Sequence, residues 1–320
     1  MVEVSYFPIV FYINILYMNH SLKILKTIPL ILDVKKISLH LGIREKLGDQ
    51  LWEKAVSNSK KINIYRIIYK SGGNKVVGFI IEPRKNSAKL PCIIWNRGGT
   101  GDFGSIKQGQ LFLELGKFAK EGYLVIASNY SGSPGSEGVD DMGGKNLINI
   151  LDLYKILKIH PCVDIKRIGM YGWSRGGMMT YMCLAKVRWI KVAIIGAGPT
   201  DEIEAPQFRK GWREHQIGIY GESREEQIKR SALYWPEKFS KKTPLLMMHG
   251  TADWRVNPAD SICLAEKLYK NKVPFRLVMF EGGDHGLNDF KDEVDRLEIE
   301  WFEKYLKHGE KWPSLKPHGR

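Results

Sequence analysis

Three residues of types that together perform nucleophilic catalysis follow predicted strands in this chain: Ser174, Asp253 and His285. A serine hydroxyl is a weak nucleophile at neutral pH, so it needs a nearby base and an acid that orients the base. A histidine can take the serine proton, while an aspartate holds the imidazole in the required tautomer. The three residues therefore predict a hydrolase that works through an acyl-enzyme.

The sequence around Ser174 is typical of a sharp turn between a strand and a helix. Residues 172–176 read Gly-Trp-Ser-Arg-Gly, between a strand-like stretch at 167–171 and a helix-like stretch at 177–187. Such a turn holds the serine in a strained, exposed position, and the glycines let neighbouring backbones approach closely. This context makes Ser174 the candidate nucleophile.

The proposed acid and base each follow a strand of their own. Asp253 lies 79 residues after Ser174, and His285 lies a further 32 residues on. The order Ser, Asp, His is that of an α/β-hydrolase. His249 competes as the base, but its place at a strand end favours a structural role. Asp284 competes as the acid, but neighbouring loop residues seldom face each other, so Asp253 is favoured.

The negative charge that develops on the attacked oxygen needs hydrogen-bond donors. We expect one donor to be the backbone N–H of Arg175, the residue after the nucleophile. A second should come from the loop Asn96-Arg97-Gly98-Gly99, which follows a predicted strand. A plain glycine turn is the alternative interpretation of that loop.

The same loop continues into a pattern that resembles a dinucleotide-binding site. Residues 99–104 match Gly-x-Gly-x-x-Gly after a strand, but such a site also needs an acidic residue at the end of the next strand. That strand, 123–129, is followed by Tyr130 and Ser131. The chain also has no Walker loop, no His-Glu-x-x-His and no EF-hand loop. We expect no organic cofactor and no metal.

Strand-like and helix-like stretches alternate along most of the chain. The strand candidates after the first hairpin are short apolar runs, which suits a parallel sheet covered on both faces. They are residues 91–95, 123–129, 167–171, 191–195, 244–249 and 275–280. The helix candidates are residues 108–121, 144–159, 177–186, 258–271 and 288–306. The pattern predicts a doubly wound, mostly parallel sheet of about eight strands, with the site beyond the carboxyl ends of the strands.

Three regions are predicted. Residues 1–60 form an N-terminal helical extension, with helical spacing over 33–59; residues 61–310 form the catalytic domain; residues 311–320 form a tail. The extension is followed by a hairpin, with alternating stretches at 62–69 and 76–81.

Within the extension, residues 6–18 are apolar but too short to span a membrane. Three interpretations of them stay open: a packed arm, a membrane-surface anchor, or a segment upstream of a start at Met18.

The composition indicates which kinds of partner and which cell compartment to expect. The chain has 320 residues and a formal net charge of +14. Its basic residues are scattered in pairs rather than in blocks, which favours a solvated surface over a nucleic-acid partner. The four cysteines lie far apart with no Cys-x-x-Cys, which predicts a reducing, cytoplasmic location. The sequence gives no indication of the oligomeric state.

Together the motifs resemble the catalytic domain of the prolyl oligopeptidase family of serine peptidases over about residues 62–306. The segments that carry the resemblance are residues 168–177, 160–164, 129–135, 249–253 with Val256 and Pro258, and 283–286. The resemblance implies an α/β-hydrolase with the triad Ser174, Asp253 and His285. It also implies an oxyanion contact from the loop position of Asn96 or Arg97.

The chain departs from the family in three places. Sixty residues before the first hairpin are too few for the β-propeller that many members carry. Asn96-Arg97 stands where a tyrosine or histidine is usual, and Ser131 where an arginine is common. The resemblance favours a peptidase of small peptide or aminoacyl substrates. Because stand-alone domains of this kind include esterases, a carboxylesterase is the alternative, and a non-catalytic binding protein is a remote one.

The residues 199–242 are rich in charged and aromatic side chains and fall where the substrate would enter. We expect a small lid or pocket wall there, with a peripheral helical excursion as the alternative. The candidate pocket residues are Tyr130, Trp173, Trp212 and Trp235.

Overall fold

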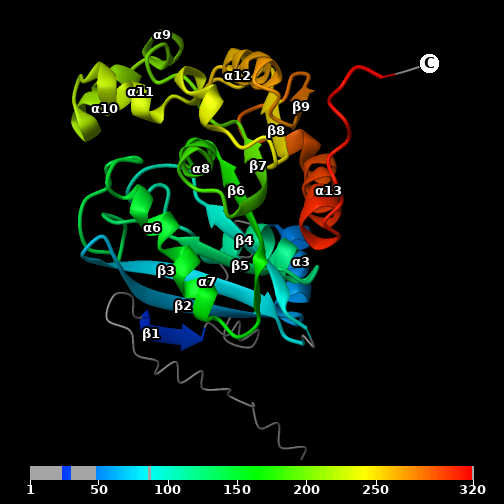
Figure 1. The fold of residues 1–320 in the computed structure, drawn as a ribbon. Helices are drawn as coiled ribbons and strands as arrows, with labels where there is room; N and C mark the ends of the chain where they lie inside the picture. Colours follow the sequence, from blue (N-terminus) through cyan, green and yellow to red (C-terminus); the bar gives the residue numbers. More distant parts are fainter. Residues whose placement is uncertain (1–23, 30–47, 86–87, 319–320) are drawn as a thin grey trace, which may run out of the picture.

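The computed structural model describes residues 24–29, 48–85 and 88–318, which contain one nine-stranded sheet (Figure 1). The strands are β1 (Ile24–Pro29), β2 (Ile62–Ser71), β3 (Asn74–Pro83), β4 (Leu90–Asn96), β5 (Leu124–Ser128), β6 (Val163–Trp173), β7 (Ile190–Gly196), β8 (Leu245–Gly250) and β9 (Phe275–Phe280). Their order across the sheet is β1-β2-β3-β5-β4-β6-β7-β8-β9.

The sheet is parallel from β5 to β9 and antiparallel at its other side. β1, β2, β3 and β5 pair antiparallel in turn, and every later neighbouring pair is parallel. The predicted mostly parallel sheet is therefore confirmed. The ninth strand is β1, which pairs with β2. β1 lies inside the N-terminal extension expected to be helical.

The first hairpin closes through the predicted glycine turn. Ser71 pairs with Asn74, so only Gly72 and Gly73 connect β2 to β3. Their φ angles are 57° and 89°, the left-handed region that a type I′ turn requires at both central positions. Glycine adopts these angles without a Cβ penalty.

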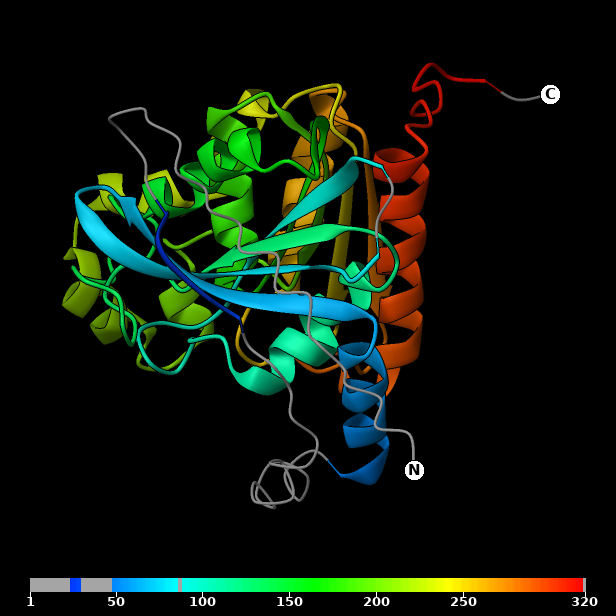
Figure 2. The ribbon, with the colours of Figure 1, turned by 90° about the horizontal axis from the view of Figure 1, so that it is seen from below.

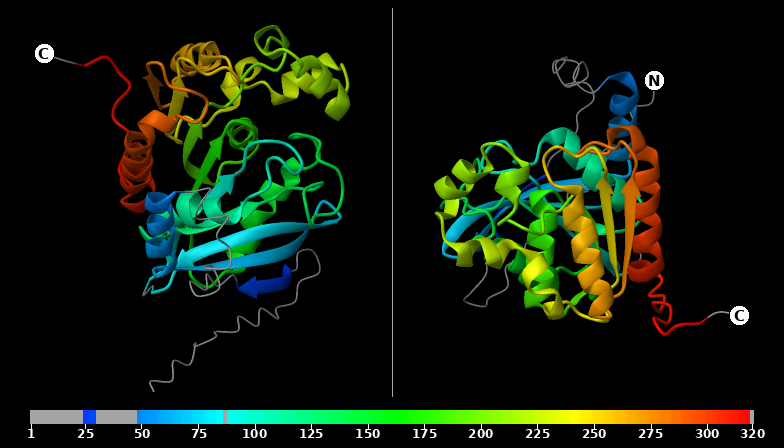
Figure 3. Two further views of the ribbon diagram at one scale, coloured as in Figure 1. Left: turned by 180° about the vertical axis from the view of Figure 1, so that it is seen from behind. Right: turned by 90° about the horizontal axis from the view of Figure 1, so that it is seen from above.

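Helices cover both faces of the sheet (Figures 2 and 3). One face carries α3 (Asp49–Ser59), α4 (Gln108–Gln110), the π-helix η1 (Leu111–Leu115), α5 (Gly116–Ala119), the short turn η4 (Asn288–Phe290), α13 (Lys291–Phe302) and the π-helix η5 (Glu303–Lys307). The other carries α6 (Leu147–Leu151), α7 (Leu153–Ile159), α8 (Arg175–Lys186) and α12 (Pro258–Lys270). Each face buries its own apolar cluster against the sheet.

The predicted lid region holds three short helices and two 3₁₀ turns. They are α9 (Ala205–Phe208), α10 (Trp212–Tyr220), α11 (Arg224–Arg230), η2 (Ala232–Tyr234) and η3 (Pro236–Lys238). Figure 1 shows α9 to α11 at the top of the molecule, on the far side of α8 from β1. The segment connects the carboxyl end of β7 to the start of β8.

Several predictions for the N-terminus fall on residues 1–23 and 30–47, which lie outside the described residues; these include the apolar stretch 6–18. Of the helix predicted over 33–59, the described part is α3. In the described part of the chain, no helix combines the length and apolarity needed to cross a bilayer. The tail after η5 is irregular as far as residue 318, and Trp312 packs against Trp301 with ring centroids 5.7 Å apart.

A buried ionic network joins α5 to α13. The Lys117 ammonium pairs with Glu298 and lies 2.7 Å from Asp295 Oδ1. Lys54 of α3 reaches the other oxygen of Asp295 at 3.3 Å. Burial alone would lower the pKa of Lys117, but the charges of Glu298, Glu114 and Asp295 raise it above its usual value. The network therefore holds Lys117 charged inside the fold.

We predict that Lys117→Met destabilises the protein by about 3–5 kcal/mol, because it leaves the Glu298 carboxylate buried without its cation. Thermal unfolding should shift down by roughly 10 °C, as measured by calorimetry. The double variant Lys117→Met/Glu298→Leu should recover most of the loss, and Lys120→Met, whose lysine is more exposed, should change little. Equal melting temperatures for Lys117→Met and the parent protein would contradict the prediction.

Candidate active site

Ser174 occupies a strained turn between β6 and α8. Its backbone angles are φ 57° and ψ −127°, a combination that costs energy for a residue with a side chain. The turn is held because Ser174 N donates a 2.8 Å hydrogen bond to Gly196 O at the end of β7. The predicted sharp turn therefore exists, and it lies at the carboxyl edge of the parallel strands.

Two glycines allow this turn to pack against its surroundings. A Cβ on Gly172 would lie 2.1 Å from Gly176 O, and a Cβ on Gly176 would lie 2.1 Å from Asn96 O. Both contacts are with backbone, which cannot swing aside. The end of β4, the turn and the first residues of α8 thus approach one another at a distance that only glycine permits.

His285 and Asp253 meet across two loops. His285 Nδ1 lies 2.7 Å from Asp253 Oδ2, while Asp253 Oδ1 accepts the backbone N–H groups of Arg255 at 2.8 Å and Val256 at 3.1 Å. Burial would raise the pKa of Asp253, but the hydrogen bonds from His249 and His285 keep that pKa well below its usual value. The carboxylate is therefore charged and fixed.

The loop of His285 is attached to the residue before the proposed nucleophile. Trp173 Nε1 donates a 2.8 Å hydrogen bond to His285 O, which places the His285 loop beside the Ser174 turn. Within the described residues, no hydrogen bond joins the Ser174 hydroxyl to the His285 ring. In structures without substrate such bonds are often long and shorten only when substrate binds.

A second imidazole, from His249, contacts the same carboxylate. His249 is fully buried, with Nε2 3.1 Å from Asp253 Oδ2 and Nδ1 2.7 Å from Ser261 Oγ. The sequence predicts a structural role for His249 but not this contact, because the strand pattern does not show which way its ring points. The other competitor, Asp284, accepts hydrogen bonds from Gly286 and Asn288 and so stabilises its own loop.

The loop after β4 lies directly against the nucleophile. A Cβ on Gly98 would be 3.4 Å from Ser174 Cβ and 3.1 Å from Trp173 O. Arg175 is the first residue of α8, and the first N–H groups of a helix have no partner within it. Backbone N–H groups from both segments are thus available next to Ser174.

The side chains of Asn96 and Arg97 have other partners. Asn96 Nδ2 donates to Thr180 Oγ1 at 2.9 Å, and Arg97 Nε donates to Asn129 O at 2.9 Å. Both side chains are about 1% exposed. Because both side chains are buried and have these partners, we infer that an oxyanion contact from this loop would come from its backbone.

A buried charge cluster that the sequence did not reveal supports this loop. The guanidinium groups of Arg97 and Arg175 both reach Asp140, with Arg97 Nη2 at 3.5 Å and Arg175 Nη1 at 2.7 Å from Asp140 Oδ2. Both lie over the Tyr130 ring, at 4.6 Å and 5.0 Å from its centroid. Burial, with the nearby charge of Arg175, lowers the pKa of Arg97 to about 10.

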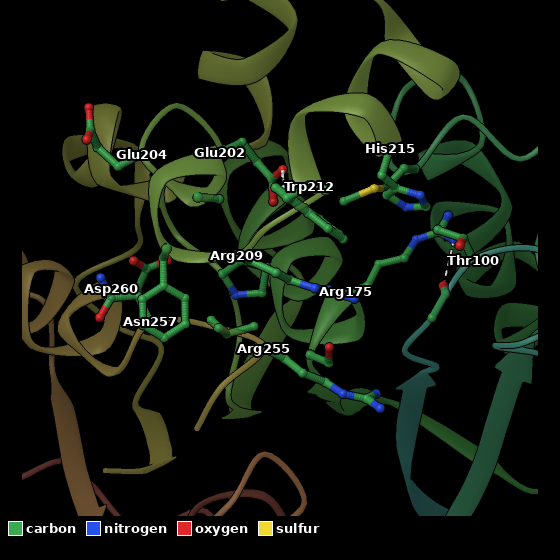
Figure 4. Close-up of a pocket in the computed structure, with 18 of the residues that line it drawn as sticks. Thr100, Arg175, Glu202, Glu204, Arg209, Trp212, His215, Arg255, Asn257 and Asp260 are labelled. Atoms are coloured by element: carbon green, nitrogen blue, oxygen red, sulfur yellow. Dashed lines mark hydrogen bonds between the residues drawn. The ribbon is translucent and has the colours of Figure 1, made fainter. Parts of the chain in front are cut away.

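Ser174 lines a cavity of about 290 Å³ (Figure 4). The rest of its lining comes from Met142, Arg175 and three segments within residues 99–103, 199–215 and 255–260. The first part of the predicted lid is therefore a wall of this cavity. Figure 4 shows Trp212, Arg209 and Arg255 close together around its centre.

The four candidate pocket residues divide accordingly. Trp212 lines the cavity. Tyr130 is fully buried against the guanidinium groups of Arg97 and Arg175, and Trp235 is 5% exposed with its Nε1 donating to Ile228 O. Trp173 holds the His285 loop. Tyr130, Trp235 and Trp173 are thus not among the residues that line this cavity.

The cavity wall carries two arginines that lack a carboxylate partner. Within the described residues, neither Arg209 nor Arg255 forms a salt bridge; Arg255 lies 4.8 Å from the ring centroid of Trp254, and Arg209 lies 4.6 Å from that of Trp212. Burial and the charge of Arg255 lower the pKa of Arg209. By contrast, the Glu202 carboxylate accepts hydrogen bonds from Trp212, Gln216 and Tyr220.

The fold and the strained serine turn define an α/β-hydrolase. The chain belongs to the prolyl oligopeptidase family of serine hydrolases, whose model matches residues 110–309. It is 27% identical over 223 residues to the uncharacterized peptidase YtmA of Bacillus subtilis, covering 68% of this chain and 84% of YtmA. It is 26% identical to the putative esterase YitV of the same organism, covering 71% of this chain and 94% of YitV.

A solved structure shows the same fold. The acylaminoacyl peptidase of Pyrococcus horikoshii superposes with a TM-score of 0.69 at 23% identity, covering 80% of this chain and 44% of that one. Dipeptidyl-peptidase 5 of Porphyromonas gingivalis is 26% identical over 74% of this chain but only 36% of its own length. The chain therefore spans less than half of these two larger relatives.

Asp260 provides a pH-sensitive group in the cavity wall. Its Oδ2 accepts backbone N–H groups from Thr200 at 2.8 Å and Asp201 at 3.3 Å. Burial outweighs these hydrogen bonds and raises the pKa of Asp260 to about 7. An aspartate in an unfolded chain has a pKa of about 3.9. Stability from this group is therefore fully present below about pH 4 and is lost as the pH rises through about 7.

We predict that Asp260→Asn lessens the fall in stability between pH 5 and pH 8 by on the order of 1–3 kcal/mol, because the amide cannot ionise. Urea unfolding at both pH values measures the difference. Asp289→Asn, at a position where the carboxyl is outside the cavity, serves as the control. The same pH slope for Asp260→Asn and the parent protein would refute a raised pKa at this position.

Proposed function

We propose that this chain is a serine peptidase of small peptide or aminoacyl substrates, with Ser174 as nucleophile, His285 as base and Asp253 as the acid that orients the base. The observation that carries the proposal is the 2.7 Å contact between His285 and Asp253. The His285 loop is hydrogen-bonded to Trp173, and the next residue is the strained Ser174, which lines the cavity. The geometry matches the division of roles in a serine triad.

The chemistry follows from this arrangement. His285 takes the proton of Ser174 as the hydroxyl attacks the substrate carbonyl. The oxyanion accepts hydrogen bonds from the backbone N–H of Arg175 and from the loop that begins at Arg97, beside the positive end of the α8 dipole. His285 then protonates the leaving amine, and water releases the acyl group.

The cavity favours a short substrate with an electron-rich end. A volume of about 290 Å³ admits a few residues rather than a folded chain. The side chains of Arg209 and Arg255 can donate to a backbone carbonyl or carboxylate of such a substrate. In this proposal residues 199–242 act as a lid whose first part selects the substrate. The cytoplasmic location and the surface contact through residues 6–18 stay predictions.

A carboxylesterase is the second candidate, and the match that spans 94% of the putative esterase YitV favours it. Esters and amides pass through the same acyl-enzyme, so the triad does not distinguish them. The ratio of kcat/KM for an aminoacyl p-nitroanilide and its matched p-nitrophenyl ester separates the two candidates. A peptidase should turn over the anilide, whereas an esterase should act on the ester alone.

We predict that Ser174→Ala lowers kcat on either substrate by at least about 10⁴-fold, because no other hydroxyl replaces the nucleophile. Labelling by a fluorophosphonate probe should disappear in the same variant, while circular dichroism stays unchanged. Ser314→Ala, in the exposed tail, should keep full activity and labelling. Turnover by folded Ser174→Ala would exclude Ser174 as the nucleophile.

We predict that Arg255→Gln raises KM by about 10–100-fold with a smaller change in kcat, because it removes a charged donor to a non-reacting part of the substrate. Steady-state kinetics on a peptide substrate measures both constants. Arg213→Gln is the matched control, since Arg213 pairs with Glu222 on the exposed surface of α10. An unaltered KM in Arg255→Gln would show that this arginine does not bind the substrate.

A further inference from the structure

Three metal-binding side chains meet at the edge of the sheet opposite the active site. Glu82 lies at the end of β3, while His160 and Cys162 lie in the turn between α7 and β6. The turn is fixed to the sheet because Leu90 N, at the start of β4, donates to Cys162 O at 2.7 Å. The cluster therefore joins two segments that are far apart in the sequence.

The three side chains are close enough to share one ion. His160 Nε2 lies 3.8 Å from Glu82 Oε2, and one ligand atom from each residue lies within 4.8 Å of the others. Ligands of tetrahedral zinc, with bonds of about 2.0–2.3 Å, are separated by roughly 3.3–3.8 Å. A side-chain shift of about 1 Å at Cys162 or His160 closes the remaining difference.

Tyr65 hydrogen-bonds the Glu82 carboxylate, but one carboxylate oxygen, Oε2, lacks a partner among the described residues. Glu82 is 8% exposed and His160 is 6% exposed, and Glu82 Oε2 has no hydrogen-bond partner. In the described part of the chain, no lysine or arginine forms a salt bridge with it. A buried carboxylate that is charged normally has a paired cation or a metal, so the unpartnered Oε2 beside His160 and Cys162 favours a cation at this position.

We propose that Glu82, His160 and Cys162 bind a divalent transition-metal ion of the zinc type, with water in the fourth position. A thiolate, an imidazole and a carboxylate form a ligand set that suits zinc. On binding, the Cys162 thiol releases its proton to solvent and forms the sulfur–metal bond, with no change of oxidation state. Calcium and magnesium, which need oxygen ligands, are excluded by the same set.

Two neighbouring groups adjust to the ion. Metal binding through His160 Nε2 requires the ring proton on Nδ1, so the weak 3.4 Å contact from Cys162 N to Nδ1 opens. The Tyr65 hydroxyl keeps its hydrogen bond to the Glu82 carboxylate. The ligands are thus the three named side chains.

The site would stabilise the fold rather than take part in hydrolysis. The ion would connect the end of β3 to the start of β6, the strand that leads to Ser174, and its binding free energy adds to that of folding. The sequence does not predict it, because its ligands come from separate segments and do not form a short cysteine–histidine motif.

Cobalt(II) binding to the chelator-treated full-length protein tests the proposal. We expect one Co²⁺ per chain, with a thiolate-to-cobalt charge-transfer band. Zn²⁺ should displace the Co²⁺ and remove the band, whereas Ca²⁺ and Mg²⁺ should not. Cys162→Ala should abolish the band, and Glu82→Gln should weaken Co²⁺ binding by at least about tenfold. Cys263→Ala, at an exposed cysteine, and Ser174→Ala should bind as the parent does.

Thermal unfolding gives a second measurement. Zn²⁺ at micromolar concentration should raise the melting temperature of the parent and of Cys263→Ala but not of Cys162→Ala. Near-ultraviolet circular dichroism establishes that each variant is folded; if Cys162→Ala is not, Glu82→Gln decides. The absence of a charge-transfer band in the parent protein, or the same band in folded Cys162→Ala, would overturn the proposal.

Discussion

The contact on which the site depends is the close approach of three backbone segments at Ser174. The end of β6, the start of α8 and the loop after β4 lie so close together that a Cβ added at Gly172, Gly176 or Gly98 would be in close contact with a neighbouring segment. The hydrogen bond from Ser174 N to Gly196 O holds the residue at a positive φ. A side chain at Gly172 or Gly176 would collide with backbone and so move the proposed nucleophile.

The proposed catalytic groups and the proposed substrate wall are built by separate parts of the chain. Ser174, Asp253 and His285 follow β6, β8 and β9. In the sheet, β8 and β9 are neighbours, and β7 lies between β6 and β8. The wall from residue 199 to 215 is an insertion between β7 and β8, anchored by Glu202 and its three donors. Changes in this wall can therefore alter the substrate without disturbing the strand ends that hold the chemistry.

The strands of the sheet and the order of Ser174, Asp253 and His285 could be predicted from local patterns, because short apolar runs and glycine turns report on their own segment. β1 could not, since its pairing with β2 depends on a distant partner. The burial of Tyr130 and Trp235 and the inward direction of Asn96 and Arg97 were likewise missed. These side chains are placed by tertiary packing, which composition and spacing do not encode.

The two arginines that share Asp140 leave one positive charge uncompensated beneath the strained turn. It is sequestered from water, since both guanidinium groups are about 4% exposed or less, and so it is screened weakly by salt. A carbonyl that enters above it meets an electric field whose direction was set when the protein folded. That field needs no solvent rearrangement as the bond polarises, so in the proposed mechanism the Arg97 side chain, which does not line the cavity, contributes to the electrostatics of substrate activation.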